Sequence, residues 1–530
     1  MVPRPERPGS GIASWSWLLV WGALVAVALA LRPLLPVDET RYLSVAWEMW
    51  RGGDWLVSHL NGVPYSDKPP ALFWAILLGW RALGVSAWWP RLLPPLFALL
   101  SALLLARIVA RIRPGLEGML VLPFLSGLLW VTYSTLLLFD TLLTACVLVA
   151  VSGVVEAWRG RRLAGWLACG TGIGLGALSK GPVVLVHVLP VALLAPWWAR
   201  PAPAGGWRRW YLGVLAALAL GAAIGLAWAL PAGAHGGAAY RSALLWEQTA
   251  GRVTGRITGR LGHPRPWWWY LAVLPVALYP WGLWPPYWRA LTRAGGPLDL
   301  PARFALAWVV PGVAVLSLFG GKQIHYLMPL LPGFAILAGA RCRDAEPRRW
   351  DAAVPAGLLL LAGAALLIAE RLRQTVRLPQ WLSEVSPAWG AALLAGALLL
   401  AFIKEGQRQV VALSLTCPLL LIAVHLAGAG PLGRRYDLEP VAALLKAGEQ
   451  AGRPIAFVGP YSGQFHFLGR LDRPFEETTR DSLAAWAAGH PLGLVVRVVG
   501  SPRHAGGALI SRPYGQYVVA VWSAGGLREK

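Results

Sequence analysis

Residues 36–70, the first hydrophilic stretch of the sequence, gather five carboxylates and end in Lys68-Pro69-Pro70. The five are Asp38, Glu39, Glu48, Asp54 and Asp67. A carboxylate in a site can accept a proton or stabilise a developing positive charge, and a lysine can bind an anionic group. Glu48 suits an amphipathic helix and Gly53-Asp54-Trp55 a turn, so we expect structural roles for these two acids. Asp38 and Glu39 are the catalytic candidates of this stretch.

Further ionisable and polar residues lie at the ends of apolar segments. Asp140 begins such a segment with no cation beside it in the sequence, and an ionisable group in so short a boundary turn is more often functional than structural. The others are Arg41, Ser179, Lys180, Glu247, Arg252, Arg256, His263, Arg265, Lys322, Gln323, His325 and Tyr326. For any one of them, Lys180 included, a solvated charge at a helix end is the alternative interpretation.

Together these residues suit an anionic substrate at a membrane surface. A phosphate needs fixed cations, and the candidates are Lys68, Lys322 and Arg252. Tyr326 would share a helical face with Lys322 and offer a hydroxyl donor. An attacking hydroxyl needs a base, and Asp38 and Asp140 suit that role. We expect the remaining substrate contacts from Arg41, Asp67, Lys180, Glu247, His263 and Gln323.

Neither a zinc signature nor a glycine-rich phosphate loop is present in the sequence, so we expect no metal site. The run Gly170, Gly172, Gly174 and Gly176 has small residues at alternate positions. It indicates close packing between membrane helices rather than nucleotide binding.

The elements that must position the site are membrane helices. The 530 residues are 56% hydrophobic and 14% charged, with a mean hydropathy of +0.53. Apolar runs near the ~20 residues needed to cross a bilayer recur along the chain. They lie near 14–31, 91–110, 118–136, 139–157, 163–179, 182–198, 210–230, 267–288, 304–319, 324–340, 353–369, 386–403 and 409–428. We therefore expect an all-α membrane protein with about thirteen transmembrane helices.

Residues 71–84 form a further apolar segment that is short for a span and contains Arg81. If this segment lies along the outer interface, the Arg-rich short loops share one side, as the positive-inside rule requires. The N-terminus is then inside, and the long loops 32–90 and 231–266 are outside. The apolar run after Arg4 and Arg7 has no cleavage pattern, so we expect it to be a retained anchor.

Residues 431–530 form a separate outer domain, because their apolar runs shrink to strand length. Strands are predicted at 454–459, 492–500 and 517–523, and helices at 437–450 and 481–489. A membrane domain of residues 1–430 thus precedes a small α/β domain.

The net charge of +23 comes from arginines between apolar runs, so it sets orientation and indicates no nucleic-acid partner. The four cysteines form no disulfide framework.

Separate blocks of the sequence resemble lipid-carrier-dependent glycosyltransferases of the GT-C fold. The resemblance is strongest to the bacterial lipid A aminoarabinose transferases within the wider protein O-mannosyltransferase superfamily. The blocks are DETRYLSVAWEM with GDWLVSHLNGVPYSDKPP, FDT at 139–141, SKGP at 179–182, WEQTAGR with GHPRPWWWY, and GGKQIHYLMPLLPGFAIL. They cover residues 36 to about 340, and GPYSGQFHFLGRLDRPF of the C-terminal domain resembles the tail of these proteins.

The resemblance implies an enzyme that moves a sugar from a polyprenyl (undecaprenyl) phosphate carrier to a lipid A, lipopolysaccharide-type or other envelope acceptor. Such enzymes work on the periplasmic side of the bacterial inner membrane. By position, Asp38 matches the catalytic carboxylate of the first loop and Asp140 the second acidic site, while Lys68 and Tyr326 match groups at the carrier phosphate. We expect no cofactor beyond the donor, membrane lipids as partners, and a monomer.

Two departures from the family pattern concern the sugar and the acceptor. Asp67 stands where the aminoarabinose transferases usually have Glu, and Gln248-Thr249 stand where a His is usual. The alternative within the enzyme class is transfer to Ser or Thr of exported proteins, which needs a base that a phosphate acceptor does not need. The alternative from another class is a lipid or glycolipid transporter, but transporters place polar residues near the membrane midplane, and spans 210–230, 353–369 and 386–403 carry no charge.

Overall fold

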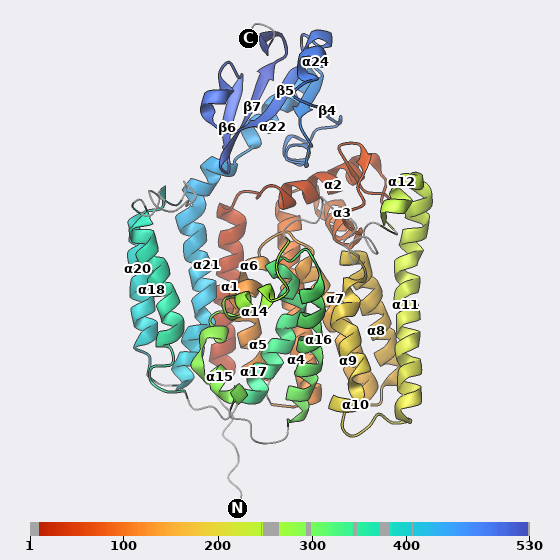
Figure 1. The fold of residues 1–530 in the computed structure, drawn as a ribbon, viewed down its shortest axis with the longest axis vertical. Coiled ribbons are helices and arrows are strands. Elements are labelled where there is room, and N and C mark those ends of the chain that lie inside the picture. Colours follow the sequence, from red (N-terminus) through yellow and green to blue (C-terminus); the bar gives the residue numbers. More distant parts are fainter. Residues whose placement is uncertain are drawn as a thin grey trace, which may run out of the picture.

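The computed structural model describes residues 10–115, 117–244, 246, 264–292, 298–342, 347–369, 371, 382, 384–404 and 406–527. Its helices form a bundle, and a small α/β domain stands on one end of that bundle (Figure 1). The described N-terminal helix starts at the opposite end (Figure 1). The predicted arrangement of a helical membrane part followed by an α/β part is therefore confirmed.

The long helices of the bundle coincide with predicted apolar segments. They are α1 (Ser10–Leu31), α4 (Trp88–Ile112), α7 (Asp140–Trp158), α8 (Arg162–Lys180), α9 (Val184–Leu193), α11 (Gly206–His235), α16 (Leu300–Leu318), α17 (Leu331–Cys342), α18 (Ala353–Leu367), α20 (Pro387–Ala401) and α21 (Gly406–Tyr436). Short helices join them: η1 (Gly181–Val183), α10 (Ala195–Trp198), α12 (Gly237–Ser242) and η4 (Ile324–Leu330).

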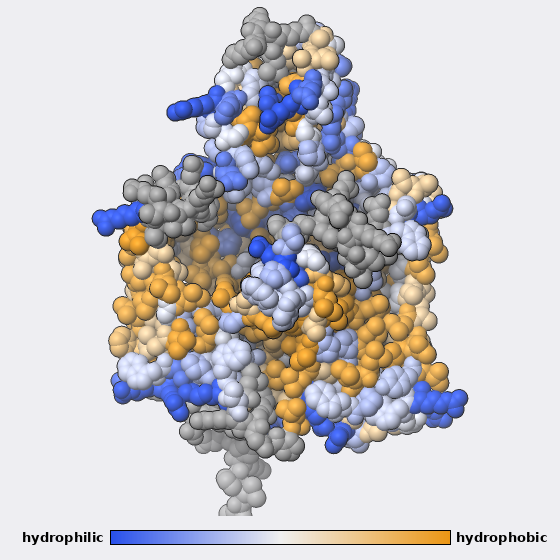
Figure 2. Space-filling model, viewed as in Figure 1, coloured by the Kyte–Doolittle hydropathy of each residue, from blue (hydrophilic) through white to orange (hydrophobic). Residues whose placement is uncertain are grey.

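Hydrophobic residues dominate the outer surface of the bundle, and hydrophilic residues gather at its lower end and over the α/β domain (Figure 2). Within the described residues, six helical stretches are long and apolar enough to cross a bilayer, and further apolar helices of 10–17 residues accompany them. A surface of this kind belongs in a membrane, because exposing apolar side chains to water is unfavourable in free energy, whereas exposing them to lipid is not. The number of thirteen spans stays a prediction.

Two predicted segments are broken into shorter helices. Residues 118–136 divide into α5 (Glu117–Ser126) and α6 (Leu128–Tyr133), because Gly127 takes an extended conformation between them. Residues 267–288 divide into α14 (Trp269–Ala277), η3 (Trp281–Leu283) and α15 (Pro285–Thr292). Pro280 and Pro285 interrupt that second segment, since proline lacks the N–H that a continuing helix needs.

Residues 32–90 form a cap between the bundle and the α/β domain (Figure 1). It contains α2 (Asp38–Gly52), the hairpin β1 (His59–Leu60) and β2 (Val63–Pro64), and α3 (Ala71–Leu83). The helix predicted at the interface, 71–84, is therefore α3, at the same end of the bundle as α2. Glu48 accepts hydrogen bonds from the backbone N–H groups of Asn61 and Gly62 at the hairpin turn, so its predicted structural role is confirmed.

Helices α7 and α8 form an antiparallel pair with backbones in close approach. A Cβ added to Gly172 would lie 2.5 Å from the backbone nitrogen of Ala150, and one added to Gly165 would lie 2.5 Å from that of Ala157. Gly170 and Gly174 approach Leu220 and Ile224 of α11 in the same way. The glycine run is thus a packing surface, as predicted, and it fixes which ends of α7 and α8 are neighbours.

Replacing Gly172 with alanine is expected to destabilise the protein by ~1–3 kcal/mol, because the new methyl group overlaps the α7 backbone. Thermal unfolding in detergent measures the effect. Gly357→Ala in α18 is the matched control: it gains the same helix propensity, and its added Cβ meets no atom within 4 Å. Equal unfolding temperatures for the two variants would contradict the packing argument.

The C-terminal domain has a five-stranded sheet in the order β4-β3-β5-β7-β6 among the described residues. Its elements are α22 (Glu439–Gln450), β3 (Ile455–Val458), α23 (His466–Gly469), β4 (Glu476–Thr478), α24 (Leu483–Gly489), β5 (Leu494–Val499), η6 (Pro502–Ala505), β6 (Ile510–Tyr514), β7 (Tyr517–Ser523) and η7 (Gly525–Leu527). β3 pairs in parallel with β4 and β5, and β7 pairs antiparallel with β5 and β6.

The three predicted strands and both predicted helices of the C-terminal domain are present, whereas β4, β6 and α23 were not predicted. β6 escapes a pattern search because its residues are mostly exposed and include Pro513. The membrane helix α21 continues to Tyr436, beyond the predicted boundary at residue 431.

Candidate active site

The α7–α8 pair brings together two charged residues that are 40 positions apart in the sequence. Asp140 is the first residue of α7 and Lys180 the last of α8, so the antiparallel packing makes them neighbours. The Lys180 Nζ donates to Asp140 Oδ1 at 2.6 Å. The Asp140 side chain is 4% exposed and the Lys180 side chain 14%, so this ion pair is largely shielded from solvent.

A third element, η4, completes the cluster around Asp140. His325 Nε2 lies 3.9 Å from Asp140 Oδ2, and Lys180 Nζ lies 4.7 Å from the centre of the Tyr326 ring. The Tyr133 ring of α6 packs on His325 with centroids 5.3 Å apart. Asp140 thus has a cation on one oxygen and an imidazole near the other.

Asp38 and Arg41 lie on the first turn of α2. Arg41 Nη2 donates to Asp38 Oδ1 at 2.8 Å, and the Asp38 side chain is 55% exposed. The Arg41 Nε is buried and has no hydrogen-bond partner among the described residues. Burial acts to lower the pKa of Arg41, but Tyr65, Asp38, Tyr42 and Asp67 raise it, so the guanidinium stays charged among acidic and phenolic groups. A buried, unpaired donor suits an anionic ligand.

Aromatic rings connect the Asp38 helix to the Asp140 helix. Tyr42 of α2 packs edge-on against Phe139, the residue before Asp140, with centroids 5.0 Å apart. Phe73 of α3 contacts both rings, at 6.3 Å from Tyr42 and 5.6 Å from Phe139. Burial, followed by the charge of Asp38, raises the pKa of Tyr42 well above its usual value, so this phenol is neutral. The two candidate carboxylates therefore flank one aromatic cluster.

Glu39 has different surroundings from Asp38. Its side chain is 3% exposed and pairs with both terminal nitrogens of Arg32, and its oxygens also accept from the backbone N–H groups of Leu35 and Leu137. Burial acts to raise the pKa of Glu39, but Arg32 and the two N–H groups outweigh it and lower the pKa. The structure places Glu39 in a closed network rather than beside a cavity.

Lys68 and Asp67 lie between β2 and α3. The charge of Lys68 acts on both Asp140 and His325. Asp67 lines a groove of about 480 Å³, and so do Ser66 and Lys180. The rest of the groove is mostly apolar and is formed by α8, α9 and α11, with Ile173, Val184, Leu218 and Leu226 among its walls. The groove thus joins an apolar channel to a charged end.

The structure does not bring all predicted residues to this cluster. Lys322 is 3% exposed, and its ammonium donates to the backbone oxygens of Arg265 and Phe319, which ties the end of α16 to residues 264–266. Gln323 is fixed through its backbone oxygen, which accepts from the Tyr270 hydroxyl. Glu247, Arg252 and His263 lie outside the described residues.

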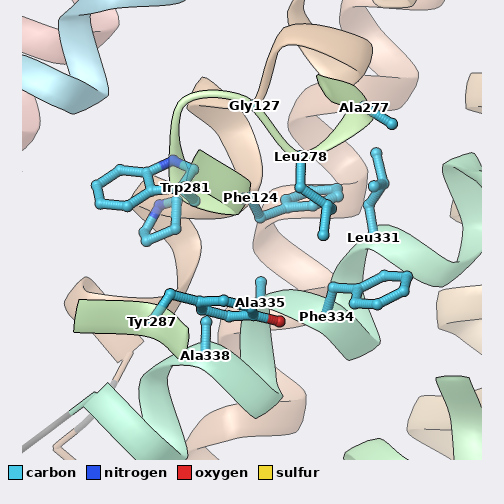
Figure 3. Close-up of a pocket in the computed structure, with 12 residues that line it drawn as sticks. Phe124, Gly127, Ala277, Leu278, Trp281, Tyr287, Leu331, Phe334, Ala335 and Ala338 are labelled. Carbon is cyan, nitrogen blue, oxygen red and sulfur yellow. The ribbon is translucent and has the colours of Figure 1, made fainter. Parts of the chain in front are cut away.

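Another pocket lies among α5, the segment 277–282, α15 and α17 (Figure 3). Phe124, Leu278, Trp281 and Phe334 line it, and its volume is about 30 Å³, enough for a single water molecule. It is too small for a sugar. No group of three or more His, Cys, Asp or Glu side chains that could hold a metal ion occurs in the described part of the chain.

Tyr133, Tyr42 and Tyr65 belong to the site but were not predicted. Tyr133 lies in an apolar segment, where only its hydroxyl distinguishes it from packing residues. Tyr42 and Tyr65 lie within the resembling blocks of the first loop, and a phenol near several charged residues was the available signal.

Three comparisons with known proteins show what this chain is similar to. Residues 67–232 match the family model of dolichyl-phosphate-mannose-protein mannosyltransferases. The undecaprenyl phosphate-alpha-4-amino-4-deoxy-L-arabinose arabinosyl transferase of Pseudomonas aeruginosa (strain UCBPP-PA14) is 32% identical over 455 residues, which are 78% of this chain and 79% of that protein.

Two crystal structures of ArnT from Cupriavidus metallidurans share the fold at 20% identity, covering 96% of this chain and 98% of theirs. The TM-score is 0.75 for the apo state and 0.73 for the state bound to undecaprenyl phosphate.

Proposed function

Since this chain belongs to the family of undecaprenyl phosphate-aminoarabinose arabinosyl transferases, we propose that it moves an amino-pentose or related sugar from undecaprenyl phosphate to a lipid A-type acceptor. The chain is a membrane glycosyltransferase. One observation carries the proposal: an apolar groove ends at Lys180. Lys180 is paired with Asp140, and the positive charge of Lys68 also acts on Asp140. An isoprenoid phosphate has this same division into an apolar tail and an anionic head.

In this proposal the carrier tail lies in the groove between α8, α9 and α11, and the phosphate lies toward Lys68, Lys180 and the Tyr326 hydroxyl. Transfer breaks the bond between the anomeric carbon and the phosphate oxygen, and the acceptor oxygen forms a new bond to that carbon. The electron pair of the broken bond leaves with the carrier phosphate, whose developing charge the lysines stabilise. Arg252 and Arg41 are further candidates for contacts with anionic groups.

The carboxylates act on the sugar and the acceptor. Asp38 is exposed enough to meet an acceptor oxygen and accept its proton, while Asp140 is buried against the cations. We propose that Glu39 positions the site rather than reacting in it, because four donors occupy its oxygens. A phosphate acceptor is already ionised, and for a Ser or Thr acceptor Asp38 would be the base.

The experiment is transfer from a radiolabelled undecaprenyl phosphate sugar by the purified, lipid-reconstituted protein. Lipid A and an exported Ser/Thr-rich protein are offered together as acceptors. Label in lipid A supports the proposal, and label in protein supports the O-glycosylation alternative. If the label stays on the carrier although both acceptors are present, the protein does not catalyse the proposed transfer.

Lys68→Ala is expected to weaken carrier phosphate binding by ~1.5–3 kcal/mol, or roughly ten- to hundredfold, because a charge-assisted partner is lost. Affinity for undecaprenyl phosphate in nanodiscs measures the effect. Lys322→Ala is the matched control, since its ammonium is engaged by two backbone oxygens and its loss should lower stability instead. Equal weakening by both variants would place Lys322 at the phosphate after all.

We propose further that α2, α3 and the C-terminal domain face the periplasm. A cysteine replacing exposed Arg503, in a background lacking Cys146, Cys169, Cys342 and Cys417, should react with a membrane-impermeant maleimide added to spheroplasts. A cysteine replacing Arg200, at the other end of the bundle, should react only after lysis. The reverse labelling pattern would show that the C-terminal domain faces the cytoplasm and would contradict the proposed topology.

A further inference from the structure

The segment 463–475 of the C-terminal domain, part of the block GPYSGQFHFLGRLDRPF, lies directly against α2. We call residues 463–475 the docking segment. Ser44 Oγ donates to the Gly463 oxygen at 2.7 Å and accepts from the Phe467 N–H at 3.2 Å. Trp47 Nε1 donates to the Leu471 oxygen at 2.8 Å, and Arg51 pairs with Asp472 at 2.8 Å. Ser44, Trp47 and Arg51 follow one another at helical spacing, so they form one face of α2.

Asn61, at the turn of the β1–β2 hairpin, makes the most specific contact. Its side chain donates to the Phe475 oxygen at 3.0 Å and accepts from the Phe475 N–H at 2.7 Å, as a neighbouring strand would. The same residue donates its backbone N–H to Glu48 of α2 at 2.7 Å. The hairpin therefore connects α2 to the C-terminal domain through buried hydrogen bonds.

Phe467 belongs to the hydrophobic core of the cap, although it lies more than 380 residues away in sequence. It is 2% exposed and shares a cluster with Tyr42, Leu43 and Trp47 of α2 and Phe73 of α3. Its ring stacks on Trp80 at 5.5 Å with an interplanar angle of 3°. Removing Phe467 would leave a cavity beside the aromatic rings that connect α2 to Asp140.

Hydrogen bonds within the C-terminal domain also hold the docking segment in its shape. The Tyr461 hydroxyl accepts from the N–H groups of Phe465 and His466 and donates to His466 Nδ1 at 2.7 Å, while His466 Nε2 donates to the Arg473 oxygen at 3.1 Å. Burial lowers the pKa of His466 to about 4, so the ring is neutral at pH 7. Glu449 Oε1 accepts from the N–H groups of Asp472 and Arg473, both at 2.8 Å.

Other contacts of α2, such as the pairing of Glu39 with Arg32 and the packing of Tyr42 on Phe139, are made with the helical bundle, so the face with Ser44, Trp47 and Arg51 depends on segment 463–475. No side chain caps its N-terminus, and a helix of 15 residues is marginal alone in water. The docked segment also approaches the functional end of the helix, because a Cβ added to Gly463 would lie 3.0 Å from the Arg41 Cα. Gly463 has φ +80°, a conformation that favours glycine and permits this approach.

We propose that the C-terminal domain is a positioning part of the active site: segment 463–475 fixes α2 and thereby sets where Asp38 and Arg41 meet the substrate. This inference rests on the proposed function. A catalytic group misplaced by ~1 Å can lose ~10²-fold in rate even when substrate binding is intact. The carrier phosphate contacts at Lys68, Lys180 and Tyr326 lie on other elements and should be unaffected.

The test uses full-length protein with Asn61→Gly, which keeps the left-handed turn conformation but removes both hydrogen bonds to Phe475, and with Phe467→Ala. Both variants are expected to lower kcat at least about tenfold while KM for the undecaprenyl phosphate sugar changes by less than about threefold. Hydrogen exchange of the α2 amides should become faster. Phe467→Leu, which refills most of the cavity, should recover most of kcat, and Ser501→Ala, away from the docking segment, should match wild type.

Faster exchange in α2 with an unchanged kcat would overturn the inference, and so would unchanged exchange in both variants. An equal loss of kcat in Ser501→Ala would also overturn it, because the effect would then be a general one. If wild-type protein transfers no sugar at all, the proposed function fails. The exchange of α2 in Asn61→Gly and Phe467→Ala then decides alone whether the domain fixes this helix.

Discussion

An Asp140→Asn variant is expected to lose sugar transfer by ~10²-fold or more, because the amide keeps the shape of the side chain but has neither its charge nor its basicity. The same change leaves Lys180 in a shielded site without its counter-ion. Breaking a buried pair from one side costs up to ~3–5 kcal/mol, so stability should fall as well. Transfer rates and unfolding in the same detergent measure the two losses.

The double variant Asp140→Asn/Lys180→Met separates structure from chemistry. Removing both charges should return much of the lost stability, since no uncompensated charge is left. Transfer should not return, because the carboxylate is still absent. A double variant that regains wild-type transfer would show that the pair only holds α7 and α8 together.

An Asp38→Asn variant is expected to lose transfer by a similar ~10²-fold but to unfold almost as wild type does. The Asp38 side chain is 55% exposed and its partner Arg41 is one helical turn away. Exposed pairs of this kind contribute at most ~1 kcal/mol, so little stability is at stake. Steady-state rates with saturating donor and thermal unfolding together give the comparison.

Glu39→Gln is the matched control, one residue away. It removes one partner of a buried pair with Arg32, so unfolding should become easier by up to ~3–5 kcal/mol. Because the folded pKa of Glu39 is lowered from 4.5, its stabilisation is present above that pH and is lost as the pH falls below it. Normal stability of Glu39→Gln, or a strongly destabilised Asp38→Asn, would reverse the roles assigned to the two acids.

Asp140, Lys180 and Tyr326, which the sequence singled out, lie together in the structure, because chemistry-bearing residues in a membrane protein are few and lie at helix ends. The sequence predicted Asp140 as functional from its position alone. It did not predict that Lys180 neutralises Asp140, since 40 residues separate them. The signal was available in the short connection between the predicted segments 139–157 and 163–179, because a short connection makes neighbouring helices antiparallel and places the start of the first beside the end of the second.

Other roles depended on tertiary contacts that no local pattern contains. Asp38 and Glu39 are adjacent acids, and only the position of Arg32 and the Leu137 N–H distinguishes the exposed from the buried one. Lys322 stands at the end of an apolar segment as a phosphate ligand would, but the oxygens of Arg265 and Phe319 surround its ammonium. The packing role of the glycine run and the strands β3, β5 and β7, by contrast, follow from local periodicity and were predicted, whereas the exposed strand β6 and the short β4 were not.

The contact between Asn61 and Phe475 sets an order of events during biosynthesis. The two residues are 414 positions apart, and a ribosome adding ~5–20 residues per second needs roughly 20–80 seconds to cover that distance. Throughout this time α2 and its hairpin are already outside the ribosome while their docking partner does not yet exist. Nascent chains that stop before residue 463 therefore insert a bundle in which α2 and its hairpin lack their partner in the C-terminal domain.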